Sequence, residues 1–267
     1  MLEMGKKRRL SRIFKRSERT LIIPMEWGTQ FASNDWSVCA SMTNAVIEGG
    51  ADAIMTTYGQ ARKFAEHLLK VPLVITINYG SSDSAYPLEY VKDVSQLGAE
   101  AVKVHFFGPL AGIPILELQR LSSECKNYGM PFLFEPIPMS DYPSAGGKQL
   151  LDPKVIKQAV DIGVIVGADI VKTAYTGSAE SFREVSKGCP IPVIIAGGLP
   201  RASDKETLDM IEGAMRGGAS GGAIGRNITT HKNPMKMTKA VSKIIHEGVS
   251  VEDALRVLAS DKDPSLH

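Results

Sequence analysis

Apolar residues recur along the chain in short runs bounded by turns, and the segments between these runs have helical spacing. Several helical segments begin at a capping residue or Pro and end at Gly, among them residues 35–48, 89–97, 114–128, 153–166, 179–187 and 205–216. Eight apolar runs have the length of buried strands: residues 21–25, 53–57, 73–78, 101–106, 132–137, 170–174, 193–196 and 221–224. Eight alternations of strand and helix predict an α/β fold, the closed parallel (β/α)8 or TIM barrel, in preference to an open sheet.

The turns that lead into the strands alternate in kind. The even-numbered strands follow Gly50-Ala51-Asp52, Gly98-Ala99-Glu100, Gly167-Ala168-Asp169 and Gly218-Ala219-Ser220. Strands three, five and seven follow Val71-Pro72, Met130-Pro131 and Ile191-Pro192. In the even set Gly supplies a left-handed helix cap, and in the odd set Pro occupies the start of a strand without removing a ladder hydrogen bond. The pattern favours a repeat around one barrel, the alternative being a set of unrelated tight turns.

Length and composition favour one domain over residues 1–267. The 267 residues are 43% hydrophobic, enough for two small domains or one large barrel, and no linker or low-complexity block divides them. The formal net charge of +2, from 31 basic and 29 acidic side chains, gives no overall reason to expect nucleic acid. The basic N-terminal segment, about residues 1–19, is either a polyanion-binding arm or a solvated segment lying over the barrel; we favour the second.

Several classes of protein are disfavoured by what the chain lacks. No apolar stretch approaches the roughly 20 residues of a membrane span, and the basic N-terminal segment has no apolar region of signal-peptide length. Cys39, Cys125 and Cys189 are far apart and form no C-x-x-C pair, so neither a disulfide framework nor a zinc site is indicated. We therefore expect a cytoplasmic protein without a metal or cofactor.

Lys172 is the most informative single residue. It ends an apolar run, residues 167–172, that seldom carries a lysine unless the amine has a chemical role. Only a neutral amine can attack a ketone to form a Schiff base, and a low-dielectric pocket favours the neutral form. The alternative is a lysine that reaches solvent from a strand end or pairs with a carboxylate.

The repeat places a second lysine beside this one. Aligning residues 98–103 with residues 167–172 puts Lys103 and Lys172 at the same depth on strands four and six. If both point into the barrel, each ammonium group makes the other harder to charge, which would favour the neutral nucleophile. Alternatively Lys103 points outward or serves only as a counter-ion to a substrate phosphate.

The candidates for proton transfer are acids and phenols at the ends of strands. Glu135 lies inside the apolar run 132–137, so it is either near-neutral and able to donate a proton or paired with one of the two lysines. Its alternative is an outward-facing residue with a salt-bridge partner. The remaining candidates are Glu26, Tyr142 and Tyr175, with His105 a weaker one.

Two neighbouring loops have the composition of a phosphate site. In barrels of this kind the active site lies at the carboxyl ends of the strands, and phosphate commonly docks after strands seven and eight. Those loops contain Gly197, Gly198, Gly225 and Arg226. Exposed backbone N–H groups and a guanidinium could converge there on one anion, although a glycine pair alone is also ordinary turn chemistry.

Three motifs together resemble a known family. Residues 167–177, the Val-Ile-Ile-Ala-Gly-Gly of residues 193–198 and the Gly-Arg-Asn-Ile of residues 225–228 are similar to those of the archaeal-type class I fructose-bisphosphate aldolases. The likeness runs from about residue 5 to 227. That family also includes the archaeal heptulosonate synthases and an autoinducer thiolase. The resemblance implies a barrel with a Schiff-base lysine at Lys172, phosphate contacts at Gly197, Gly198, Gly225 and Arg226, and a ring-built homo-oligomer, with a decamer as one form.

The chain departs from the family pattern at two positions. Family members usually show Pro-Met-Asp-His-Gly after strand one, where this chain has Glu26 and Trp27 in place of the acid and the histidine. The strand-five tyrosine of the family, a proton donor, falls on Ile137. Either Tyr142 or Glu135 has taken over the proton transfer, as a glutamate does in other class I aldolases, or the reaction has changed.

These features favour a class I aldolase that cleaves or forms a carbon–carbon bond in a phosphorylated sugar such as fructose 1,6-bisphosphate, in carbohydrate metabolism and glycolysis. Lys172 would form the imine, Glu135 or Tyr142 would move the proton, Glu26 would position substrate hydroxyls and Lys103 would tune the site. One alternative is a Schiff-base transferase of the heptulosonate synthase or thiolase type. Another is a phosphate-binding barrel without imine chemistry. We expect no nucleic-acid or membrane partner.

Overall fold

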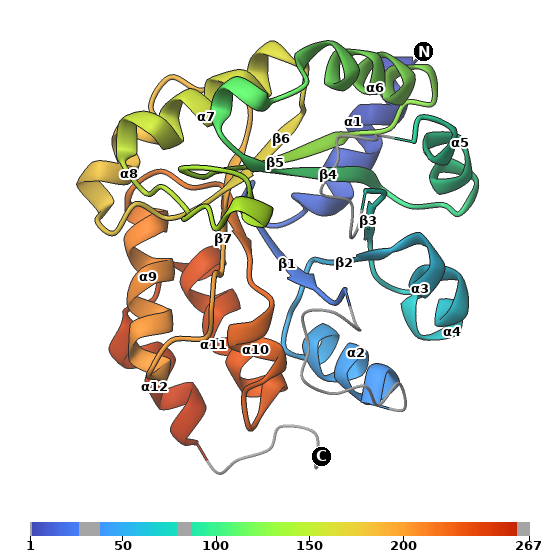
Figure 1. Ribbon diagram of the computed structural model, residues 1–267. Helices are drawn as coiled ribbons and strands as arrows, with labels where there is room; N and C mark the ends of the chain where they lie inside the picture. Colours follow the sequence, from blue (N-terminus) through green and yellow to red (C-terminus); the bar gives the residue numbers. More distant parts are fainter. Residues whose placement is uncertain (1, 27–37, 79–86, 261–267) are drawn as a thin grey trace.

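The computed structural model describes residues 2–26, 38–78 and 87–260, and its strands close into one parallel barrel in chain order (Figure 1). The strands are β1 (Thr20–Pro24), β2 (Ala53–Thr57), β3 (Leu73–Thr76), β4 (Ala101–Gly108), β5 (Phe132–Pro138), β6 (Ile170–Thr173), β7 (Val193–Ala196) and β8 (Gly221–Ala223). Each predicted run corresponds to one of them, with ends that agree within two residues. The predicted (β/α)8 barrel is confirmed.

The helices are α1 (Leu2–Ile13), α2 (Val38–Glu48), α3 (Tyr58–Lys63), α4 (Ala65–Leu68), α5 (Glu89–Gln96), α6 (Ile115–Asn127), α7 (Pro153–Ile165), α8 (Ala179–Ser186), α9 (Asp204–Arg216), α10 (Arg226–Thr229), α11 (Pro234–Glu247) and α12 (Val251–Ala259). Helices α2 to α9 connect successive strands around the barrel, while α1 precedes the first strand and α10 to α12 follow the last (Figure 1). The helix predicted over residues 35–48 is α2, and residues 35–37 lie outside the described part of the chain. The other five predicted helices agree within one residue at each end.

The turns into the even strands have the predicted left-handed geometry. Their glycines have φ angles of 98°, 83°, 81° and 91° at Gly50, Gly98, Gly167 and Gly218. The alanine that follows each one donates its N–H back to the last turn of the preceding helix, as Ala51 does to the carbonyl oxygen of Val46 at 3.0 Å. This six-to-one bond is the mark of a Schellman cap, so all four helices end in the same way.

The acidic residues of three of these turns join neighbouring strands at the amino-terminal end of the barrel. The carboxylates of Asp52, Glu100 and Asp169 each accept a backbone N–H bond of 2.8 Å from the start of the preceding odd strand. The donors are Leu21, Leu73 and Phe132. The position that reads as Asp or Glu in three repeats therefore has a structural role at the barrel floor.

Helix α1 contains much of the basic N-terminal segment and lies against this floor. Ile13 is fully buried in a cluster of inward-facing strand residues, with Leu10 and Phe14 packed beside it. Three basic side chains of the segment pair with the three turn acids: Lys6 with Asp169 at 2.8 Å, Arg12 with Glu100 at 3.2 Å and Arg16 with Asp52 at 2.8 Å. The segment thus lies over the barrel as expected, but it is a packed helix rather than a merely solvated run.

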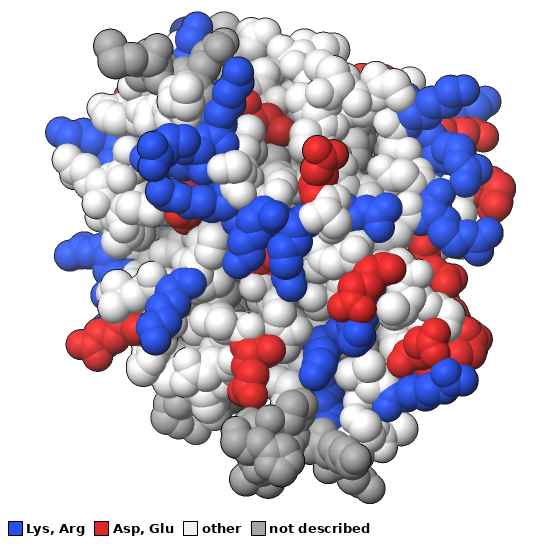
Figure 2. Space-filling model, turned by 180° about the vertical axis from the view of Figure 1, so that it is seen from behind, with Lys and Arg blue, Asp and Glu red and all other residues white. Residues whose placement is uncertain are grey.

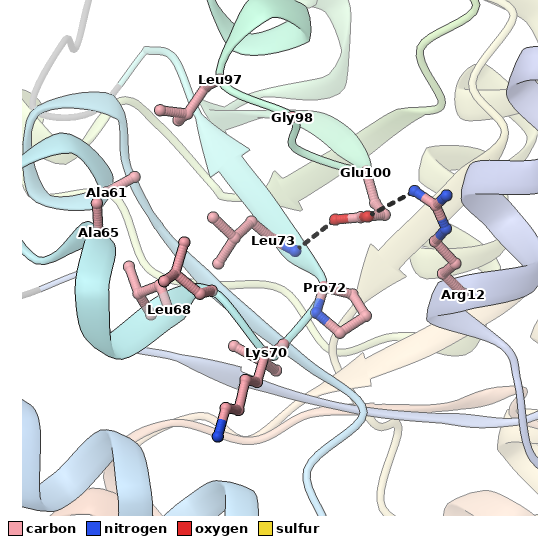
Figure 3. Close-up of a pocket in the computed structure, with 12 residues that line it drawn as sticks. Arg12, Ala61, Ala65, Leu68, Lys70, Pro72, Leu73, Leu97, Gly98 and Glu100 are labelled. Carbon is pink, nitrogen blue, oxygen red and sulfur yellow. Dashed lines mark hydrogen bonds and ion pairs between the residues drawn. The ribbon is translucent and has the colours of Figure 1, made fainter.

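A cavity of about 310 Å³ lies beside α1 at this floor, between α4 and the start of β3 (Figure 3). Figure 3 shows the Glu100 carboxylate between the N–H of Leu73 and the guanidinium of Arg12. The surface charge is mixed rather than uniformly basic: seen from behind, Lys and Arg side chains are spread over the face with Asp and Glu among them (Figure 2). Within the described residues, no helix is long and apolar enough to cross a membrane.

Candidate active site

A cavity of about 340 Å³ opens at the carboxyl ends of the strands, opposite the floor that α1 covers. It is lined from β1, from β4 through β8 and from the loops that follow them. Of the residues that the sequence predicted for the site, it brings together Glu26, Lys103, Glu135, Lys172, Gly197, Gly198, Gly225 and Arg226. The lysines, the carboxylates and the glycine loops therefore share one chamber.

Glu135 lies between the two lysines. Its Oε1 is 2.7 Å from Nζ of Lys172 and its Oε2 is 2.8 Å from Nζ of Lys103. All three side chains are less than one tenth exposed. The three come from neighbouring strands, with β5 between β4 and β6, so alternate residues that point inward from each strand meet in the barrel. The two lysines are thus arranged around one carboxylate rather than as an isolated pair of like charges.

The environment of Glu135 keeps its carboxyl group ionised. Burial would raise the pKa of Glu135, but the ammonium groups of Lys103 and Lys172 outweigh burial and lower the pKa to about 2. Of the two states that the sequence left open, the paired carboxylate is therefore the one in the structure. At neutral pH, Glu135 enters a reaction as a proton acceptor, and it can donate a proton only after it has received one.

Lys103 also contacts His105, two residues further along β4. Its Nζ is 3.1 Å from Nδ1 of His105. Burial, followed by the charge of Lys103, lowers the pKa of His105 to about 3, so this imidazole is neutral at physiological pH. His105 lines the same cavity and is only 9% exposed, although sequence reasoning had ranked it as a weak candidate.

Glu26 approaches this cluster from the end of β1. Its side chain is buried, accepts a hydrogen bond from the hydroxyl of Thr76, and lies 3.8 Å from Nζ of Lys103. The position is the one at which the chain carries a longer acid than the family it resembles. Trp27 and Gly28, which complete that motif, lie outside the described residues.

The two predicted phosphate loops are held together by their own side chains. Arg226 donates from Nη2 to the carbonyl oxygen of Gly198 at 3.1 Å. Asn227, a residue for which the sequence indicated no role, donates from Nδ2 to the carbonyl oxygen of Gly197 at 3.0 Å and accepts from the backbone N–H of Arg201. Its only signal was its place directly after Arg226. The loops after β7 and β8 thus form one unit at the cavity wall.

The structure does not bring the two candidate tyrosines to Lys172. Tyr142 is 40% exposed, packs edge-on against Phe106 at 6.4 Å, and has its hydroxyl beside Gly112. The hydroxyl of Tyr175 lies beside Gly213 of α9. Neither tyrosine lines the cavity, and the sequence could not show this because both follow strands that do contribute to it.

Two other cavity residues received no role from the sequence. Ile137 faces the cavity two residues after Glu135, so an aliphatic side chain occupies the position where the resembling family carries a tyrosine. Gln149 reaches the cavity from the loop after β5, where an antiparallel bridge pairs it with Met139. Nothing in the residues around Gln149 marks it as a cavity residue. Within the described residues, no group of three or more His, Cys, Asp or Glu side chains is arranged to hold a metal ion.

Comparison with known proteins identifies the family. Residues 21–231 match the model of the DeoC/LacD family aldolases. This chain belongs to that family. It is 34% identical over 263 residues to the 2-amino-3,7-dideoxy-D-threo-hept-6-ulosonate synthase of Halobacterium salinarum, an alignment that covers 96% of this chain and 97% of the relative. A synthase of the same name in Archaeoglobus fulgidus is 31% identical, over 94% of this chain and 95% of that one. The aldolase relationship inferred from the motifs is confirmed.

Solved structures show the same fold at lower identity. An archaeal fructose 1,6-bisphosphate aldolase superposes on this aldolase with a TM-score of 0.76 at 23% identity, covering 91% of this chain and all of the other. The fructose-bisphosphate aldolase of Slackia heliotrinireducens gives a TM-score of 0.77 at 19% identity, with 99% and 92% coverage. At these identities the likeness concerns the barrel and not the substrate.

Proposed function

We propose that this aldolase forms a Schiff base between Lys172 and a phosphorylated ketose, and then cleaves or forms the adjacent carbon–carbon bond. One observation carries the proposal: the amine of Lys172 lies 2.7 Å from the ionised carboxylate of Glu135, inside the cavity that the glycine loops border. A nucleophilic lysine needs a nearby base to take its proton, and Glu135 is within hydrogen-bonding distance to do so.

The first step can be balanced with these two residues alone. The Lys172 ammonium passes a proton to Glu135, and the neutral amine adds to the ketone carbon to give a carbinolamine. Glu135 then returns the proton to the departing hydroxyl, which leaves as water, and the iminium ion carries the positive charge that the ammonium had. Glu135 is again a carboxylate, and Lys103 remains beside it at 2.8 Å to hold its orientation.

Bond cleavage uses the same carboxylate a second time. Glu135 accepts the proton of the hydroxyl group on the far side of the breaking bond, that hydroxyl becomes an aldehyde, and the bonding electrons pass into the iminium to give an enamine. After the aldehyde leaves, Glu135 returns the proton to the enamine carbon, and water releases the ketone from Lys172. In this scheme Glu135 fills the place of the tyrosine that Ile137 replaces.

The substrate proposed for this chemistry carries a phosphate that binds at Gly197, Gly198, Gly225 and Arg226. The guanidinium of Arg226 and the backbone of the glycine loops border the cavity on the β7 and β8 side, next to β6. Glu26 follows β1, the neighbour of β8, and its carboxylate would hold a substrate hydroxyl beside Thr76 and Lys103. A sugar phosphate of the fructose 1,6-bisphosphate type has these groups in this order, which would place the enzyme in carbohydrate metabolism.

The experiment that tests the proposal is borohydride reduction in the presence of dihydroxyacetone phosphate, followed by intact-mass measurement and peptide mapping. We expect one adduct per chain, on Lys172, and none in Lys172→Met. Lys148→Met, which alters an exposed lysine of the β5–α7 loop, is the matched control and should form the adduct normally. No adduct on any lysine of the folded wild-type protein would contradict the proposal.

A second candidate is transfer of the bound fragment to a different acceptor. It is favoured by the 34% identity over nearly the whole chain to a protein named as a heptulosonate synthase. Both candidates share imine formation and cleavage, and they differ in what captures the enamine. Cleavage assays without an added acceptor, run beside assays with alternative aldehydes and with coenzyme A, would separate them. Turnover that requires an acceptor would favour transfer over simple cleavage.

A further inference from the structure

His105 projects into the reaction cavity from β4 and is held rigidly there. Asn78 clamps its backbone on both sides: Nδ2 of Asn78 donates to the carbonyl oxygen of His105 at 2.7 Å, and Oδ1 accepts from its N–H at 3.1 Å. The imidazole packs edge-on against Phe107, with ring centroids 4.8 Å apart. A side chain fixed in this way presents its free edge in one direction without further loss of conformational freedom.

The contact with Lys103 decides which nitrogen of His105 carries the proton. An ammonium group has only donors, so the 3.1 Å contact from Nζ of Lys103 makes Nδ1 the acceptor. In the neutral imidazole the proton is then on Nε2. Protonation of both nitrogens would bring a third positive charge next to Lys103 and Lys172, which share the Glu135 carboxylate and have Glu26 beside Lys103. The ring is therefore a neutral hydrogen-bond donor with a fixed direction.

The order of the strands shows which part of the substrate this donor would meet. The proposed phosphate loops follow β7 and β8, Lys172 is on β6, Glu135 is on β5 and His105 is on β4. Neighbouring strands are about 4.8 Å apart, so His105 comes from a strand roughly 10 Å from that of Lys172, on the side away from the phosphate loops. A ketose anchored by its phosphate and its imine would extend its remaining carbons past Glu135 toward β4.

We propose that His105 is a substrate-contacting residue that donates a hydrogen bond from Nε2–H to an oxygen of the departing aldehyde fragment. This inference rests on the proposed function and deepens it: the enzyme would select an aldehyde that carries an oxygen substituent next to the carbonyl. An alkyl aldehyde bound next to this donor would displace water and offer it no acceptor, and the lost hydrogen bond is the source of the selection.

Three variants separate the two nitrogens. In His105→Asn, Oδ1 can take the place of Nδ1 and still accept from Lys103, while the shorter amide NH2 lies at the place of Cδ2 and does not reach that of Nε2. The amide of His105→Gln reaches the place of Nε2 and can still donate there. His105→Phe keeps the ring against Phe107 and removes both functions. We expect condensation of dihydroxyacetone phosphate with glyceraldehyde to be retained better in His105→Gln than in His105→Asn or His105→Phe.

The decisive readout is the preference for glyceraldehyde over propanal in that condensation. We expect kcat/KM for glyceraldehyde, relative to that for propanal, to fall about tenfold or more in His105→Asn. The fall should come from a lower kcat/KM for glyceraldehyde. Borohydride trapping of dihydroxyacetone phosphate on Lys172 should be unchanged, because the trapped fragment does not include the aldehyde. An unchanged preference for glyceraldehyde over propanal in both His105→Asn and His105→Phe would overturn the proposal.

Two outcomes keep this inference distinct from the proposed function. If the wild-type protein forms no adduct on Lys172, the proposed function fails whatever His105 does. If the adduct forms but the His105 variants leave the aldehyde preference unchanged, the proposed role of His105 fails and the proposed Schiff base stands. Nitrogen NMR gives a readout without activity: the wild-type spectrum should contain one imidazole in the Nε2–H form from pH 5 to 8, absent in His105→Asn. The protein has five histidines, so the His105 signals are assigned by their loss in His105→Asn, and titration of that ring between pH 5 and 8 would also overturn the proposal.

Discussion

Glu135 and Lys172 lie 2.7 Å apart on neighbouring strands, with the carboxylate ionised and its second oxygen bound to Lys103. Because one carboxylate contacts both lysines, a change at any of the three alters the charge state of the others. A carboxyl group whose pKa is raised by burial would act by donating a proton, whereas the ionised Glu135 carboxylate acts first by accepting one.

Lys103→Met should move the acid limb of the pH–rate profile to higher pH. The Lys103 charge is one of the two that lower the pKa of Glu135, so without it the carboxyl group stays protonated up to a higher pH and cannot accept a proton. We expect kcat/KM to fall most on the acid side of the profile, by up to roughly 10²-fold. Imine trapping on Lys172 should fall over the same pH range, because imine formation also uses Glu135 as the proton acceptor. The measurement is the pH dependence of kcat/KM for both proteins, and coincident acid limbs would show that Lys103 does not tune Glu135.

The stabilising effect of the Glu135 carboxylate should disappear in acid. Its pKa is about 2 in the folded protein and near the ordinary value of 4.5 when unfolded, so the folded state favours the ionised form. The contribution is fully present above about pH 4.5 and is lost as the pH falls toward 2. Urea unfolding at pH 7, 5 and 4 should show the stability difference between wild type and Glu135→Gln narrowing at the lowest pH. A difference that stays constant would contradict the lowered pKa.

Arg226→Met should weaken binding of phosphorylated substrates only. A hydrogen bond to a charged group contributes about 1.5–3 kcal/mol, so we expect KM for dihydroxyacetone phosphate to rise roughly tenfold to a hundredfold. Unphosphorylated dihydroxyacetone should react as it does with wild type. Because Arg226 also bonds to Gly198, circular dichroism and thermal unfolding should accompany the kinetics. Equal losses on both substrates would point to a disturbed loop instead of a lost phosphate contact.

Asp52→Ala should destabilise the fold by about 3 kcal/mol. Asp52 is fully buried, and its carboxylate contacts the guanidinium of Arg16, the N–H of Leu21 in β1 and the imidazole of His246 in α11. Asp209→Ala is the matched control, because Asp209 pairs with Lys205 on the exposed face of α9 and its loss should cost less than about 1 kcal/mol. Chemical denaturation of the two variants checks both values, and similar losses would show that the floor ion pairs add nothing.

The strands and most of the helices could be predicted because their signals are local. Apolar runs, proline starts and glycine caps each depend on a few consecutive residues, and the caps at Gly50 and Gly98 have the expected positive φ. Helix α1 was less evident. Its basic residues concealed the three apolar positions at Leu10, Ile13 and Phe14, which have meaning only once a barrel end is available for them to cover.

The residues of the candidate site could be predicted where strand order places them, and could not where a loop does. Lys172 and the glycine loops could be predicted to share one end of the barrel, because the carboxyl ends of parallel strands meet there. The tyrosines could not be placed, since a residue just past a strand can turn inward or outward with the loop. Tyr142 turned toward Gly112 and away from the cavity.

The amino-acid sequence alone predicts an eight-stranded barrel, the family motifs and the end of the barrel at which chemistry would occur, because these depend on local pattern and strand order. The inward direction of the Lys103 and Glu135 side chains is evident only in the folded barrel. Strands covered on both faces are apolar on both, so a single polar residue does not reveal which face is the interior. Closure of the barrel brings three neighbouring strands together, and that closure places one carboxylate between two ammonium groups.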